Sequence, residues 1–321
     1  MNAKNSDCGS FAQDVLLGLS SNPKTLSSKY FYDAKGDKLF QQIMELPEYY
    51  LTRKEFEILE KQHEEILKTI LDLGVPFNLV ELGAGDGQKT KILLRYLEKK
   101  QASFSYFPID FSATVLEELI EDLEVDFPNL PVTAIENTYR GALREKAWEN
   151  GRMTLILFMG ANLGNFQLQE AFEILDHLRI GSSYEDFVLI GLDLKKDPQT
   201  ILNAYHDSKG VTEAFNLNLL TRINRELGAD FNEDSFLHWP TYDPISGECR
   251  SYLVSKKKQT VNINGINQAI HFDAFEPIFM EVSKKYSLGE IQDLANRAGF
   301  KHIQHFTDSE NLFVNSLWQK A

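Results

Sequence analysis

The feature that most constrains this chain is a glycine-rich turn between an apolar strand and a helix. The segment LVELGAGDGQKT, residues 79–90, begins with apolar residues, continues through Gly83, Gly85 and Gly87, and ends in polar residues that open a helix. Glycine lets the backbone turn sharply and lets another group approach without a Cβ in the way. This arrangement predicts a site for a nucleotide-like ligand.

Strands and helices alternate around this turn. Apolar runs predict five strands, and segments with helical spacing of apolar residues lie between them. The expected strands are 78–82, 104–110, 131–137, 153–160 and 186–194, and the clearest helices are 88–100, 112–125 and 169–178. Such alternation is typical of an α/β fold with a parallel sheet and helices on both faces.

The alternation stops after residue 194. Residues 195–286 mix a helix, a turn-rich stretch at 239–248 and alternating strands, and the earlier pattern returns at Ser287 with a helix and two strands. We therefore predict a sheet domain and a second α+β domain. The sheet domain would comprise 61–194 plus 287–321, and the second domain 1–60 plus 195–286.

The charge balance and the two cysteines narrow the class of protein. The 321-residue chain carries a formal net charge of −14, which argues against nucleic acid as a partner because phosphate binding needs a positive field. Cys8 and Cys249 make no disulfide framework, so a reducing compartment fits. No apolar run approaches the roughly 20 residues of a membrane span. We expect a cytoplasmic monomer that binds neither nucleic acid nor membrane.

No metal site is expected. The histidines are scattered, and the chain has neither an HExxH motif nor a paired-cysteine cluster. His302 and His305 fall in a predicted strand, where an odd separation sends side chains to opposite faces. On that reasoning the two imidazoles cannot share a metal.

The spacing of the glycines bears on which ligand the turn holds. A dinucleotide fingerprint would place a third glycine at position 88, which is Gln88, whereas the third glycine is Gly87. The stretch ELGAGDG instead resembles the first motif of the Rossmann-like methyltransferases that use S-adenosylmethionine (SAM). Asp110 closes the next strand, where a carboxylate can accept hydrogen bonds from ribose hydroxyls. The terminal strand pair also resembles these enzymes, whose last strand runs antiparallel.

The fourth strand is followed by FMGANLGNF, residues 158–166. DNA amino-methyltransferases carry a proline-containing motif at this point, and its absence removes that class. Asn165 can offer a carbonyl acceptor to an amine, although a turn-forming asparagine explains the spacing equally well.

Several longer segments resemble one family, the histidine-specific Nα-methyltransferases. The segments are KYFYDAKGDKLFQQIMELPEYYLTRKEFEIL (29–59), VELGAGDGQKT (80–90), GANLGNF (160–166), AYHDSKGVTEAFNLNLLTRINRELGADF (204–231) and MEVSKKYS (280–287). The resemblance covers nearly the whole chain. It implies a Rossmann-like class I SAM methyltransferase sheet, SAM as co-substrate, and trimethylation of L-histidine to hercynine, the first step toward ergothioneine.

The resemblance also implies the site residues. For SAM the matching positions are Tyr32, Gly83, Lys89, Asp110, Thr138 and Tyr139. For histidine they are Tyr49, Asn165, Tyr205, Glu281 and Ser283. Tyr32 and Asn165 would be the catalytic pair, because each offers an oxygen that can accept a proton or hydrogen bond from the substrate amine.

Glu281 and Ser283 lie two apart in a predicted strand, so both point to one face, where they can hold the two ring nitrogens of an imidazole. Two positions depart from the family. Thr138 replaces an acid expected at the adenine, and Ser251 replaces a bulky apolar residue expected beside the imidazole. Two alternatives therefore stay open: Nα-methylation of another amino acid such as tryptophan or tyrosine, and a SAM-binding module without catalysis.

Overall fold

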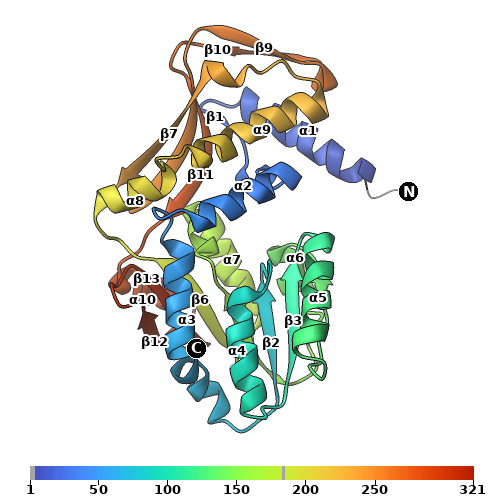
Figure 1. Ribbon diagram of the computed structural model, residues 1–321, viewed down its shortest axis with the longest axis vertical. Coiled ribbons are helices and arrows are strands. Elements are labelled where there is room, and N and C mark those ends of the chain that lie inside the picture. Colours follow the sequence, from blue (N-terminus) through green and yellow to red (C-terminus); the bar gives the residue numbers. More distant parts are fainter. Residues whose placement is uncertain (1–3, 183–184) are drawn as a thin grey trace. The chain divides into compact units, whose positions relative to one another are not determined.

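The computed structural model describes residues 4–182 and 185–321, which form two compact units (Figure 1). The sheet unit comprises Leu51–Lys195 and Lys285–Ala321, and the insertion unit comprises Met1–Tyr50 and Lys196–Lys284. The chain thus enters the sheet unit at helix α3, leaves it after strand β6 and returns before helix α10. Each unit is described by itself below.

The sheet unit contains a seven-stranded sheet in the order β12-β13-β6-β5-β2-β3-β4. Neighbours pair in parallel except at β13, which runs antiparallel to both β6 and β12. The strands are β2 (Phe77–Leu82), β3 (Phe104–Asp110), β4 (Ile135–Glu136), β5 (Met153–Phe158), β6 (Phe187–Asp193), β12 (Phe300–Thr307) and β13 (Phe313–Lys320). The predicted parallel sheet with one antiparallel strand near its end is confirmed.

Helices cover both faces of this sheet, which explains why the central strands β2, β5 and β6 are mostly apolar and are buried along their whole length. One face packs against α6 (Tyr139–Glu145), α7 (Leu168–Gly181) and α10 (Leu288–Arg297) in one hydrophobic core. Near the opposite face, α3 (Leu51–Leu71) packs against α4 (Gln88–Lys99) and β13. Helix α5 (Ala113–Asp126) packs on β3.

The insertion unit has a smaller sheet in the order β1-β11-β8-β7 and a separate β9–β10 hairpin. Its strands are β1 (Lys24–Thr25), β7 (Phe236–Asp243), β8 (Glu248–Ser255), β9 (Gln259–Ile263), β10 (Gln268–Phe272) and β11 (Pro277–Lys284). Its helices are α1 (Lys4–Ser20), α2 (Ala34–Glu45), α8 (Pro198–Tyr205) and α9 (Val211–Leu227), and α2 packs along α9. Its core joins the N-terminal segment to the insertion.

Three details differ from the sequence-based predictions. The boundary expected at residue 60 falls inside α3, a continuous 21-residue amphipathic helix that belongs to the sheet unit as a whole. The strand expected over 131–137 is shorter: β4 is a two-residue edge strand at Ile135–Glu136, and Val132 joins Tyr106 of β3 only through an isolated bridge. The stretch 239–248 is turn-like only in its middle. Its first residues continue β7, an edge strand that tolerates Pro240.

The reasoning that separated His302 from His305 is wrong. A β-bulge shifts the register of β12 between His302 and Gln304, so the alternation of faces is broken there. The two imidazole rings lie 3.9 Å apart between centroids. Burial, reinforced by repulsion from His302, lowers the pKa of His305 to about 4.

No helix within the described ranges is both long and apolar enough to cross a membrane.

Candidate active site

The order of strands locates the candidate site of the sheet unit. The chain order of the strands reverses at β2, which lies between β3 and β5. In open α/β sheets, ligands bind beyond the carboxyl ends of the strands at such a reversal. The turn at Gly83 follows β2, and the turn at Gly160 follows β5. These two turns therefore border the expected ligand position.

The glycine turn has the backbone that its sequence predicts. Gly83, Gly85 and Gly87 have φ values of +77°, +54° and +63°, a region that disfavours side chains. A Cβ on Gly83 would also lie 2.6 Å from the hydroxyl oxygen of Tyr139. Gly83 is therefore required both by the turn and by the close approach of Tyr139.

Asp110 lies at the end of β3 beside this turn. One carboxylate oxygen accepts a hydrogen bond from the backbone N–H of Gly85 at 3.2 Å, and the other accepts from the N–H of Ser112 at 3.1 Å. An ionised carboxylate has about four acceptor positions, so it retains capacity for two ribose hydroxyls. The Asp110 carboxylate is therefore suited to bind the ribose of a nucleoside ligand.

Tyr139 and Thr138 open helix α6 next to the turn. The ring of Tyr139 meets Phe158 edge-on at 5.2 Å and Phe166 at 6.4 Å between centroids. Burial, and then the nearby Asp110, raises the pKa of the Tyr139 hydroxyl, which therefore stays protonated. Thr138 is the N-cap of α6, and its hydroxyl accepts from the N–H of Gly141 at 3.1 Å. An aromatic platform thus lies beside the glycine turn, and Thr138 serves the helix.

Glu81 lies beneath the glycine turn in β2 and is fully buried. Its carboxyl accepts from the hydroxyl of Thr90 at 2.6 Å and from the hydroxyl of Tyr106. Burial raises the pKa of Glu81 to about 7, although both hydrogen bonds oppose the shift. The turn is therefore supported by a carboxyl that changes its charge near neutral pH.

Lys89, in the first turn of α4, is held by an ion pair. Its Nζ lies 2.6 Å from Oε2 of Glu55, a buried residue of α3. Both carboxylate oxygens of Glu55 also accept from the backbone N–H of Gly160, at 3.1 and 3.0 Å. Asn165 ends the short 3₁₀ helix η2 (Asn162–Asn165) that follows Gly160. The carboxylate of Glu55 thus binds both Lys89 and the Gly160 turn, which leads to Asn165.

In the insertion unit, Tyr32 and Tyr49 share an aromatic cluster. The Tyr32 ring lies 5.6 Å from Phe40 and 5.6 Å from Phe215, and Phe40 lies 6.3 Å from Tyr49. Tyr205 is the last residue of α8 and is partly exposed. Rings packed in this way have few accessible rotamers, which suits hydroxyls that must orient a small ligand.

Glu281 and Ser283 lie on β11, and both point to the same face as predicted. The register pairs Glu281 with Ser251 and Ser283 with Cys249 on β8. Ser251 is two residues from Leu253, so this face is the one that packs into the core of the unit. Ser251, the position that departs from the family, is therefore a direct cross-strand neighbour of Glu281.

The sequence-predicted residues thus fall into two groups. Within the sheet unit, contacts join Gly83 to Tyr139 and the glycine turn to Asp110, and Glu55 joins Lys89 to the Gly160 turn. Thr138 precedes Tyr139, and Asn165 follows the Gly160 turn in the same unit. The insertion unit carries Tyr32, Tyr49, Tyr205, Glu281 and Ser283. Glu55 was missed by the sequence analysis. The available signal was Gly191, a glycine inside the buried strand β6, where a Cβ would lie 2.2 Å from Oε1 of Glu55.

No group of three or more His, Cys, Asp or Glu that could hold a metal ion occurs among residues 4–182 and 185–321.

Comparison with known proteins decides the family. The family model described as "Histidine-specific methyltransferase, SAM-dependent" matches residues 11–320. The chain belongs to this family. The chain is accordingly a SAM-dependent methyltransferase of the histidine-specific family, built on a Rossmann-like sheet.

Individual relatives agree with this assignment. The histidine N-alpha-methyltransferase of Mycobacterium tuberculosis (strain CDC 1551 / Oshkosh) is 34% identical over 316 residues, which are 98% of this chain and 97% of that protein. Ergothioneine biosynthesis protein 1 of Schizosaccharomyces pombe is 30% identical over 88% of this chain and 37% of its own length. A third relative, 4-dimethylallyltryptophan N-methyltransferase easF of Claviceps fusiformis, is 30% identical over 73% of this chain and 67% of that protein.

Proposed function

We propose that this chain transfers methyl groups from SAM to the α-amino group of L-histidine, three times in succession, to form hercynine for ergothioneine biosynthesis. The observation that carries the proposal is the pair Glu281–Ser283 on one face of β11, within a chain that matches the histidine-specific family over residues 11–320. A carboxylate and a hydroxyl on one face suit the two nitrogens of an imidazole.

The proposal assigns SAM to the sheet unit. Asp110 would accept hydrogen bonds from the ribose hydroxyls, and Tyr139 would pack against the adenine. Gly83 and Lys89 complete this set, and Thr138 follows β4 at the point where an acid was expected. SAM supplies a methyl group that is already electrophilic, so the protein has to orient the acceptor and provide for its proton rather than activate the donor.

The proposal assigns histidine to Tyr49, Asn165, Tyr205, Glu281 and Ser283. Tyr49 and Tyr205 would donate hydrogen bonds to the substrate carboxylate. An α-amino group is mostly protonated at pH 7, and it must lose a proton before its lone pair can attack a methyl carbon. Oxygens of Tyr32 and Asn165 would accept hydrogen bonds from the amine and orient its lone pair, and water would carry the proton away.

A second candidate is Nα-methylation of an amino acid with a larger ring. Ser251 is small and lies directly opposite Glu281, and easF, whose name gives 4-dimethylallyltryptophan as its substrate, belongs among the relatives. A site with a small residue at this place has room beside the ring. Histidine remains the better candidate because Glu281 and Ser283 match an imidazole and leave polar groups unpaired against an indole.

The test is a mixture of the twenty common amino acids incubated with the purified protein and SAM, followed by mass spectrometry. We expect histidine to gain up to three methyl groups while the other amino acids stay unchanged. Methylated tryptophan or tyrosine in place of histidine would favour the second candidate. A mixture that is unchanged while SAM binds would identify a SAM-binding protein without this activity.

A further inference from the structure

Glu55 is a buried charged side chain that the proposed function leaves unassigned. Its side chain is 1% exposed, and its carboxylate accepts from two groups that border the candidate site. These are the Nζ of Lys89 at 2.6 Å and the backbone N–H of Gly160 at 3.0 Å. A buried charge needs such partners, so the position of each of these three groups depends on the other two.

Strand β6 has a glycine, Gly191, at the place where the carboxylate of Glu55 approaches it. A Cβ on Gly191 would lie 2.2 Å from Oε1 of Glu55 and 3.2 Å from the backbone nitrogen of Gly160. Glycine weakens a strand interior and often marks a place where another group approaches closely. Gly191 lies in β6, whose residues are all buried, and the approach of Glu55 explains why it has no side chain.

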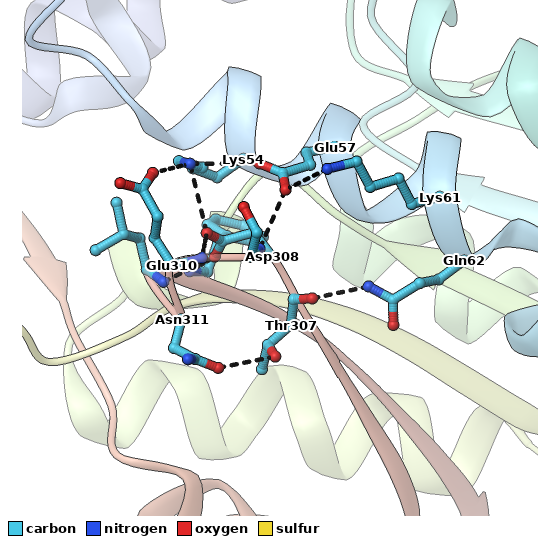
Figure 2. A network of polar contacts seen from close by, with 11 residues as sticks. Lys54, Glu57, Lys61, Gln62, Thr307, Asp308, Glu310 and Asn311 are labelled. Atoms are coloured by element: carbon cyan, nitrogen blue, oxygen red, sulfur yellow. Dashed lines mark hydrogen bonds and ion pairs between the residues drawn. The ribbon is translucent and has the colours of Figure 1, made fainter.

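The helix that carries Glu55 is anchored on another side. Figure 2 shows Lys54 and Glu57 of α3 reaching the loop that joins β12 to β13. Glu57 accepts from the N–H of Ser309 at 3.1 Å, and Gln62 donates to the carbonyl of Thr307 at 2.7 Å. These contacts hold α3 from its first turn to its middle, so the backbone that carries Glu55 is fixed in place.

Asp308 in turn holds that loop. Its carboxylate accepts from the N–H groups of Leu312 and Phe313, each at 2.7 Å, and one of its oxygens lies 3.6 Å from the Nζ of Lys54. Hydrogen bonds from Ser309 and Lys61 lower the pKa of Glu57 to about 2, so this carboxylate stays charged across the neutral range. The contacts that Glu57 makes with this loop therefore persist through the neutral range.

We infer that Glu55 is a positioning residue of the methyl-transfer site, which holds the ammonium of Lys89 and the Gly160 turn in the arrangement that SAM binds. The inference rests on the proposed function, since that assigns Lys89 to SAM. A lysine side chain loses much rotamer freedom when it is ordered, and an ion pair already formed in the free protein removes that loss from ligand binding.

The first test is Glu55→Gln, which keeps the shape of the side chain and removes its charge. The amide can accept one hydrogen bond, but its NH₂ group would face Lys89 or the N–H of Gly160, both donors. We expect the KM for SAM and the Kd of S-adenosylhomocysteine to rise roughly tenfold, the effect of losing one charge-assisted hydrogen bond. The KM for histidine should rise less than the KM for SAM, since only Asn165 of the residues assigned to histidine follows the Gly160 turn.

Glu65→Gln is the matched control, because Glu65 lies exposed on the same helix. It should leave both KM values unchanged.

Gly191→Ala is a second variant that keeps the charge of Glu55 and displaces its carboxylate. It should raise the KM for SAM in the same direction as Glu55→Gln. Gly289→Ala controls for the substitution itself, because a Cβ there would meet nothing within 4 Å.

The double variant Glu55→Gln with Lys89→Met should be less impaired in SAM binding than the product of the two single effects, because both changes break one interaction.

The inference is overturned if Glu55→Gln and Gly191→Ala lower the thermal midpoint but leave SAM and S-adenosylhomocysteine binding as in the wild type. Glu55 would then only stabilise the fold. If the wild-type protein binds SAM but methylates no histidine, only the proposed function is contradicted. SAM binding by the Glu55 variants still tests the role of Glu55 in that case. A wild-type protein that binds no SAM overturns both.

Discussion

The carboxylate of Asp110 accepts a hydrogen bond from the backbone N–H of Gly85 at 3.2 Å, which ties the end of β3 to the turn after β2. The end of β3 and the turn after the neighbouring strand β2 therefore lie together beside the point where the strand order reverses. Many of the expectations for the SAM site depend on this relationship, because it fixes a carboxylate at the place where the ribose would lie.

Replacing Asp110 with Asn should therefore weaken SAM binding. The amide keeps one acceptor oxygen, but it loses the charge, and its NH₂ group meets donors at Gly85 and Ser112. We expect the Kd for SAM to rise by about 10- to 100-fold, the range for hydrogen bonds to a charged group. Isothermal titration measures this directly. Asp72→Asn, a change at an exposed residue that follows α3, is the control and should match the wild type.

Glu81 makes stability depend on pH in a definite direction. Burial raises its pKa from 4.5 to about 7, so between these values the folded protein keeps a proton that the unfolded chain has released. The free energy of unfolding should therefore fall as pH rises through this window. The shift of about 2.5 pKa units corresponds to on the order of 3 kcal/mol.

Glu81→Gln removes this titration and keeps an amide that can pair with Thr90 and Tyr106. Urea unfolding at pH 5 and pH 8 should show that the variant gains stability relative to the wild type at the higher pH. An equal difference between the two proteins at both pH values would mean that Glu81 is not protonated in the folded state.

The sequence predicted the sheet of this protein better than it predicted individual side chains. Buried apolar strands such as β2 and β5 are recognised from composition because both faces lie against helices. The edge strand β4 has few partners and so leaves a weak pattern. The bulge at His302 cannot be read from alternation, since it breaks the alternation on which the reasoning depends.

Some residues of the candidate site could likewise be predicted from the sequence, and others could not. Gly83 and Asp110 follow strand ends, where function is expected from topology alone. Glu55 lies within a helix rich in charged residues, and nothing in its local pattern separates it from the exposed Glu64 or Glu65. Its role depends on Gly160 and Lys89, which are distant in sequence. Only Gly191, a glycine in an apolar strand, points to it.

Ser251 should influence which ring the protein accepts. It pairs with Glu281 across β8 and β11, so a longer side chain there would occupy space beside the proposed ring position. We expect Ser251→Met to weaken tryptophan binding relative to histidine by roughly tenfold, in line with small changes in pocket volume. Competition titrations with both amino acids measure the ratio.

Arg250→Met is the control for this change, because Arg250 points to the opposite face of the strand. An unchanged ratio in Ser251→Met, equal to that of the control, would place the ring elsewhere.

Glu281→Ala should affect the binding of histidine but not the binding of SAM. If Glu281 holds an imidazole nitrogen, its removal should lower histidine affinity by about 10- to 100-fold and leave SAM binding nearly unchanged. Titrations with each ligand provide the comparison. Glu248→Ala, on the neighbouring strand and the opposite face, should behave as the wild type. Histidine affinity equal to the wild type would remove Glu281 from the site.

The most direct measurement of the central claim is the position of the transferred methyl groups. Histidine is incubated with the protein and SAM that carries an isotopically labelled methyl group, and the product is followed by NMR spectroscopy. The account predicts that the label accumulates on the α-nitrogen, ending as a single trimethylammonium signal. Label on a ring nitrogen of the imidazole, or no label on histidine while SAM is bound, would contradict it.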